Sequence, residues 1–263
     1  MRRTIVGLCL TLLVAYVSVT LFNLPNLNVG LIKLRGFCRF CDLTYANLER
    51  MDLHGANLYY SNLTGAILNK TNLSDADLTG VNFEGAILTG ADLQGVVMTG
   101  ADLRGVDLRS ANLTSANLSK VNLTGTDLTG VNFEGAILIN SDLEDATNME
   151  GYASETLLCH TKFPDGTVSS CDLFRANLNG VDLPKTDLTG ADLRGANLQG
   201  ANLQGANLQG ANLQGANLQG ANLQGANLQG AYLQGANLTD VNLTKTKFCE
   251  TQMSDGKINN SQC

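Results

Sequence analysis

The chain of 263 residues contains no tryptophan, three prolines and two histidines, and aromatic residues make up only 5% of it. His54 lies at an outward position and has no repeated acidic or cysteine partner at a spacing typical of catalysis, and we expect His160 to be a solvated loop side chain. No GxSxG nucleophile motif occurs. The glycines recur at every fifth position, a spacing that serves turns and not a phosphate-binding loop. These absences argue against an enzyme, and the sequence indicates no catalytic, cofactor-binding or metal site.

Charge is also absent from one long block, residues 195–239. There the pentapeptide Ala-Asn-Leu-Gln-Gly occurs seven times without variation, from Ala196 to Gly230. If the leucine is called position i, apolar residues fall at i and i−2, as in Ala91 and Leu93. This alternation places both side chains on one side of an extended segment, and the Gly at i+2 and the nearby Asn or Asp favour a bend. The sequence therefore predicts a tube of short strands and corners, with core positions that include Phe83, Leu93, Phe133 and Leu198.

Position i is apolar at every fifth residue from Leu43 to Leu143 and again from Leu173 to Leu243. The pattern resembles the A(D/N)LXX motif of the pentapeptide-repeat family, and the chain resembles exported or membrane-anchored members of the cyanobacterial type. The resemblance implies an all-β fold, a right-handed quadrilateral β-helix with four repeats in each coil. We expect a signal peptide or transmembrane anchor at 1–25, a linker and N-terminal cap at 26–40, a first stack at 41–145, an interruption with a plug at 146–170, a second stack at 171–245 and a C-terminal plug at 246–263.

Two similar segments end the two repeat arrays. Leu158–Ser170 aligns with Phe248–Asn260, and each contains an Asp-Gly turn signal between short apolar positions. We interpret each segment as a hairpin that closes one stack.

Six of the seven cysteines occur in local pairs, and Cys9 lies in the N-terminal apolar run. An even number of cysteines in duplicated loops predicts disulfides, although small buried hydrophobic residues are the alternative. A single CxxC without further ligands does not indicate a zinc site. The disulfide candidates are Cys38 with Cys41, Cys159 with Cys171, and Cys249 with Cys263.

Residues 4–22 carry no charge and follow Arg2 and Arg3. Such an uncharged run is a membrane anchor or a signal peptide, and the lack of a small-x-small cleavage site favours the anchor. The arginines place the N-terminus in the cytoplasm. The repeats would then lie in the periplasm, the thylakoid lumen or the extracellular space, and the paired cysteines agree with an oxidising compartment.

The charge is uneven along the repeats. Residues 41–145 carry 14 acidic and 5 basic side chains, whereas residues 171–263 carry 7 acidic and 6 basic ones. The family resemblance implies an alternative function, in which the acidic rod mimics DNA and inhibits a DNA enzyme such as gyrase. An export segment would separate the rod from that enzyme. The array has no basic patch, which argues against direct binding of nucleic acid. The main hypothesis is a non-enzymatic scaffold, a membrane-tethered or exported rod that presents a regular surface to a protein or envelope partner.

The uncharged block raises further expectations. The glutamines at i+1, from Gln199 to Gln234, point outward, and stacked copies would form amide ladders along the rod. Identical repeats also specify register weakly, which makes self-association an additional expectation. A surface for ordered water or ice is a poorer fit, because the threonines at i+1 are interrupted by residues such as Glu84 and Arg104.

Overall fold

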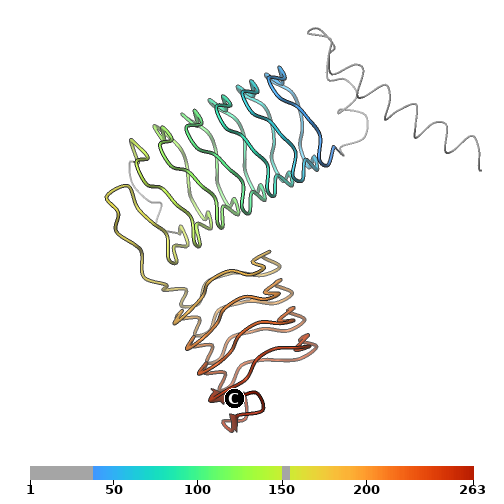
Figure 1. Cartoon of the computed structure of the whole chain (residues 1–263), viewed down its shortest axis with the longest axis vertical. Coiled ribbons are helices and arrows are strands. Elements are labelled where there is room, and N and C mark those ends of the chain that lie inside the picture. Colours follow the sequence, from blue (N-terminus) through green and yellow to red (C-terminus); the bar gives the residue numbers. More distant parts are fainter. Residues whose placement is uncertain (1–37, 150–154) are drawn as a thin grey trace, which may run out of the picture.

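The computed structural model describes residues 38–149 and 155–263 (Figure 1). The expected anchor at 4–22, Cys9 and most of the expected cap at 26–40 lie outside these residues. Within the described part of the chain, no helix is long and apolar enough to cross a membrane.

A four-sided coil built from four pentapeptides is the repeating unit of the structure. Parallel bridges join each side to the equivalent side of the next coil, as Asp42 is bridged to Asn62 and Asn202 to Asn222. Backbone hydrogen bonds flank each bridge: Asn62 N donates to Cys41 O at 2.8 Å, and Asn62 O accepts from Leu43 N at 2.8 Å. One pentapeptide forms one side, so four repeats complete a coil and place each side over the same side of the preceding coil.

Each position of the pentapeptide has a physical role at the corner. The Asn or Asp at i−1 accepts a hydrogen bond from the backbone N–H at i+1, as Asn62 Oδ1 does from Thr64 N at 3.1 Å. The next repeat closes the turn, since Ala46 N donates to Leu43 O at 3.0 Å. The i+2 residue between them takes a positive φ, 64° at Gly55. Glycine is favoured there because it has no Cβ atom.

The apolar side chains at i and i−2 fill the tube and divide into two clusters. One extends from Leu43 to Ala146, and the other comprises Ile139, Cys159 and residues from Leu173 to Phe248. The coils of the two parts stack along different directions and meet at an angle (Figure 1). The predicted core residues are all buried, with at most 5% of their surface exposed: Phe83, Leu93, Phe133 and Leu198.

Hairpins lie at the C-terminal end of each stack. At the end of the chain, strand β1 (Thr251–Gln252) pairs antiparallel with β2 (Ile258–Asn259). An equivalent antiparallel bridge joins Lys162 and Val168 in the interruption. In both hairpins the glycine of the Asp-Gly turn has a φ of 81°. The two similar sequences therefore form the same local structure.

Candidate functional site

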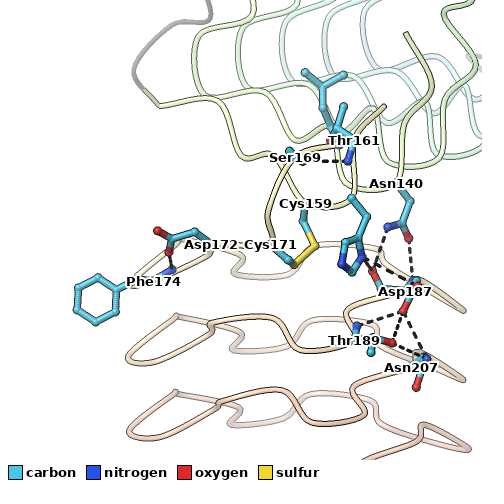
Figure 2. Close-up of a disulfide and its surroundings, with 12 residues drawn as sticks. Asn140, Cys159, Thr161, Ser169, Cys171, Asp172, Phe174, Asp187, Thr189 and Asn207 are labelled. Atoms are coloured by element: carbon cyan, nitrogen blue, oxygen red, sulfur yellow. Dashed lines mark hydrogen bonds and ion pairs between the residues drawn. A yellow bond between two sulfur atoms is a disulfide. The ribbon is translucent and has the colours of Figure 1, made fainter. Parts of the chain in front are cut away.

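The second stack begins without a complete coil in front of it. In the first stack the parallel bridges continue to Lys162, and among the residues that the structure describes they restart between Asp172 and Asp192. The first coil of the second stack, residues 172–191, therefore presents an open end toward the first stack (Figure 2). Open sheet edges are sites of unwanted pairing unless other groups cover them.

Side chains of the first stack cover part of this open end. Asn117 Nδ2 donates to Asp182 O at 3.1 Å, and Lys120 Nζ donates to Pro184 O at 2.5 Å. Burial lowers the pKa of the Lys120 ammonium, and the charge of Lys185 lowers it further. These side chains donate hydrogen bonds to backbone carbonyls that would otherwise accept them from the backbone N–H groups of a preceding coil. We call the contacts of Asn117, Lys120 and Asn140 with residues 172–191 the elbow.

Asp187 is the most connected residue of the elbow (Figure 2). Asn140 Nδ2 donates to Asp187 O at 3.0 Å, and Asp187 N donates to Asn140 Oδ1 at 2.8 Å. On the other side the Asp187 carboxylate accepts hydrogen bonds from Thr189 Oγ1 at 2.6 Å and Asn207 Nδ2 at 3.4 Å. Burial raises the pKa of Asp187, but the hydrogen bonds from Thr189 and the charge of His160 outweigh it, so the pKa is lowered.

His160 has a partner that the sequence did not predict. Its Nδ1 lies 3.3 Å from Asp187 O and 4.0 Å from the Asp187 carboxylate, and 31% of its side chain is exposed. His160 is therefore not the freely solvated loop side chain that we expected. Lys120, Asn140 and His160 occupy the same corner in consecutive coils, so they recur in the sequence at intervals of four repeats. This recurrence was the only sequence signal for the elbow.

A disulfide joins Cys159, the residue before His160 in the chain, to Cys171 (Figure 2). It connects the hairpin segment that ends the first stack with the first side of the second stack. A ring nitrogen of His160 and the two sulfur atoms lie within 4.8 Å of one another. Sulfur ligates a metal as thiolate, so in the disulfide state these cysteines offer no metal ligand.

The remaining cysteine pairs and the other histidine lie away from the elbow. Cys38 and Cys41 form a disulfide with a Cα–Cα distance of 5.5 Å, and Cys249 and Cys263 form one with a distance of 4.8 Å. His54 Nδ1 lies 2.9 Å from Ser74 Oγ on the outer surface. The structure therefore does not bring the two histidines into one site.

The first two coils carry an aromatic collar, which consists of Arg39, Phe40, Tyr45, Arg50, Tyr59 and Tyr60. Phe40, Tyr45 and Tyr60 are 71%, 76% and 53% exposed. The rings of Phe40 and Tyr60 stack with centroids 6.1 Å apart, and Tyr59 meets Tyr60 edge-on at 4.5 Å. The guanidinium of Arg39 lies 4.7 Å from the centre of the Tyr59 ring.

The second stack carries amide ladders on its outer faces. Asn237 Nδ2 donates to Asn217 Oδ1 at 3.0 Å, and Asn217 Nδ2 donates to Asn197 Oδ1 at 3.4 Å. Asn242 continues a second ladder by donating to Asn222 at 3.0 Å. Among the described residues the ladders therefore run through asparagine at i−1, and the expected ladder of glutamine at i+1 is wrong. The short asparagine side chain lies close to the tube, where its Nδ2 reaches the asparagine at the same position of the preceding coil.

The chain matches the family described as pentapeptide repeats in eight copies, which together cover residues 38–145 and 171–261. It therefore belongs to the pentapeptide repeat family, whose fold is a right-handed β-helical solenoid.

The solved structures to which this chain is similar include other pentapeptide repeat proteins. HetL from the cyanobacterium Nostoc sp. PCC 7120, involved in regulation of heterocyst differentiation, is 32% identical, with a TM-score of 0.46, over 89% of this chain and 100% of HetL. QnrB1, a plasmid-mediated fluoroquinolone resistance protein, is 19% identical, with a TM-score of 0.40, over 80% of this chain and 91% of QnrB1. A protein of the Arabidopsis thaliana thylakoid lumen is 26% identical, with a TM-score of 0.28, over 55% of this chain and 75% of its own. No curated protein matches this chain.

Proposed function

We propose that this protein is a non-enzymatic interaction scaffold. In this proposal a rod of two β-helical stacks, tethered to a membrane or exported by residues 4–22, presents its outer faces to a protein or envelope partner. The supporting observation is that different positions of each repeat have different roles. The i and i−2 side chains are used for packing, and the i−1 and i+1 side chains lie on the outside of the coil.

The elbow supports a scaffold with a defined shape. Asn117, Lys120 and Asn140 bond backbone groups of the second stack, and the Cys159–Cys171 disulfide adds a covalent link nearby. Several hydrogen bonds and a disulfide restrict relative motion more than a linker would. The faces of the two stacks then keep a fixed mutual orientation, which suits a partner that contacts both.

The tether is supported by the uncharged run at 4–22 and by the cysteine pairs in the described part of the chain. Fractionation of cells that express the full chain, combined with alkylation of free thiols, tests this part. The expected result is protein in membranes after an alkaline wash, with Cys9 as the free thiol. Protein in the soluble fraction with all seven cysteines free would contradict both the tether and the export.

Photo-crosslinking from the full chain in envelope membranes tests the scaffold function. A specific partner is expected to crosslink from one side or two adjacent sides of a coil. Equal crosslinking from every side, or none from any, would contradict the proposal. Suitable positions on successive sides are Arg104, Arg109 and Thr114 in the first stack and Gln209, Gln214, Gln219 and Gln224 in the second.

The acidic first stack supports one alternative function, in which the protein mimics DNA and inhibits a DNA enzyme. Two of its carboxylates are paired with arginine on the same side: Asp102 with Arg104 at 2.7 Å and Asp107 with Arg109 at 2.6 Å. This pairing reduces the negative potential that a DNA mimic needs. A supercoiling assay of gyrase with the full chain decides between the two. Inhibition at micromolar protein would favour the mimic over the scaffold.

A further inference from the structure

The aromatic collar is confined to one end of the rod. It lies on the first two coils, which directly follow the segment that contains the uncharged run 4–22. Corners 40, 45, 50 and 60 carry Phe, Tyr, Arg and Tyr, whereas all six corners from Gly80 to Gly105 are glycine. Aromatic and arginine side chains are therefore placed at the end of the first stack where the chain enters it.

These corners hold bulky residues in an unfavourable backbone conformation. The φ angles of Phe40, Tyr45 and Tyr60 are 56°, 56° and 53°. A residue with a Cβ atom loses about 1–2 kcal/mol in this left-handed region, where glycine loses little. The neighbouring Gly55 and Gly65 show that glycine fits at this end of the rod too. Non-glycine residues also occupy this corner elsewhere, as Lys70 and Ser110 do, so the feature that distinguishes the collar is that its corner side chains are mostly aromatic rings.

The collar combines the side chains that favour the boundary between lipid and water. Tyr and Phe place an apolar ring among the acyl chains near the headgroups, and Arg keeps its charge at the phosphates while its stem contacts apolar groups. The acidic groups in the same coils include Glu49, which lies 3.5 Å from Arg50. Because positive and negative charges are mixed in these coils, burial of the rings, and not net charge, would dominate the attraction of the collar to a bilayer.

We propose that the aromatic collar rests on the headgroup region of a lipid bilayer, so that the first stack stands on the membrane surface. This inference rests on the proposed tether at 4–22. The segment between this run and Cys38, residues 23–37, reaches at most about 50 Å when extended. The link is therefore long enough to allow contact and does not impose it, and the collar supplies the attraction that a tether alone lacks.

The absence of tryptophan makes a sharp test feasible. A single tryptophan introduced by Phe40→Trp or Tyr60→Trp reports on the collar alone. Tyr232→Trp is the matched control, because Tyr232 is 49% exposed and Tyr60 is 53% exposed, but Tyr232 lies in the second stack. The full chain is reconstituted in phosphatidylcholine vesicles whose acyl chains carry bromine close to the headgroup. An unchanged circular dichroism spectrum and melting temperature identify the variants that keep the fold.

The expected result is about a twofold loss of emission for Phe40→Trp and Tyr60→Trp in brominated vesicles, with no loss for Tyr232→Trp. If the protein resists an alkaline wash but neither collar variant is quenched, the collar proposal fails and the tether stands. Release of the protein by the wash would overturn both. Collar tryptophans that are shielded from iodide but not quenched by bromine would indicate a protein contact, which also overturns the lipid proposal.

Discussion

Asn140 and Asp187 lie far apart in the sequence and exchange two hydrogen bonds that imitate a pair of β-strands. The Asn140 side chain donates to the Asp187 carbonyl and accepts from the Asp187 N–H, as the backbone of a preceding coil would. A side-chain amide has the same donor and acceptor as a peptide group. One asparagine side chain thus takes the place of the C=O of one peptide group and the N–H of the next, which a preceding coil would supply.

Replacement of Asn140 should weaken the elbow more than an equivalent change elsewhere. Asn140→Gly removes both hydrogen bonds but relieves the positive φ of 58°. We expect a net loss of about 1–2 kcal/mol, because the lost bonds outweigh the relieved strain. Ser110→Gly is the control, since Ser110 is exposed and has the same φ of 58°. Thermal unfolding gives the stability, and small-angle scattering gives the shape. Equal effects of the two changes would show that the elbow bonds contribute nothing.

The uniform block should tolerate removal of whole repeats. Deletion of residues 201–220 takes out one coil and leaves every later residue on its original side, because each bridge joins equivalent positions of consecutive coils. We expect a folded rod shorter by about 4.8 Å, with the Cys249–Cys263 disulfide intact. Deletion of 201–205 should also fold, since the repeats on either side are identical, but it turns the C-terminal hairpin by one side. Scattering and a thiol assay check both. Loss of the fold in either variant would contradict the equivalence of the repeats.

The three disulfides should differ in their contribution to stability according to loop length. Their sequence separations are 3 for Cys38–Cys41, 12 for Cys159–Cys171 and 14 for Cys249–Cys263. Chain entropy predicts a loss of about 2 kcal/mol when the short loop is opened and about 3 kcal/mol for each longer one. Paired Cys→Ser variants, compared by chemical denaturation under oxidising conditions, test this ranking. A larger loss for the Cys38 pair would show that contacts, and not loop length, set its contribution.

Asp127 should remain ionised in acid. Hydrogen bonds from Asn148 and then Thr129 lower its pKa to about 2 from the ordinary value of 3.8. A lowered pKa means that the folded state binds the proton less readily, so this stabilisation is present above about pH 4 and is lost as the pH falls toward about 2. Asn148→Ala should raise the Asp127 pKa toward 3.8. A carboxyl NMR titration measures both values, and an unchanged midpoint would exclude Asn148 as the main cause. The difference in melting temperature between the two proteins should also disappear as the pH falls from about 4 to about 2.

Much of the tube was predictable because each pentapeptide position has one local role. Leu93 and Leu198 recur in register, so their inward direction follows from alternation along the strand. The elbow was not predictable, because Lys120 and Asn140 resemble ordinary replacements of a corner glycine, and their partners lie 64 and 47 residues further along the chain. Asp187 likewise resembles any other residue at i−1. Its contact with Asn140 depends on how the interruption places the second stack against the first, which the sequence does not show.

The ladder was assigned to the wrong residue for a geometric reason. Both Asn217 and Gln219 alternate outward, so the sequence pattern cannot distinguish them. In the structure Asn217 accepts from the Gln219 N–H at 3.2 Å, and this bond holds the asparagine side chain against the tube. The glutamine side chain has no such anchor at its base and extends outward.

The four-repeat coil has a consequence for how the length of this gene can change in evolution. Recombination between identical repeats adds or removes whole pentapeptides, and we expect the tube to accept any number of them. The direction in which the C-terminal hairpin faces returns only after four such steps. If natural selection preserves that direction, the lengths of the uniform block in closely related genomes should differ by whole coils. If they differ by any number of single repeats, selection has acted on the length of the block and not on the direction of the hairpin.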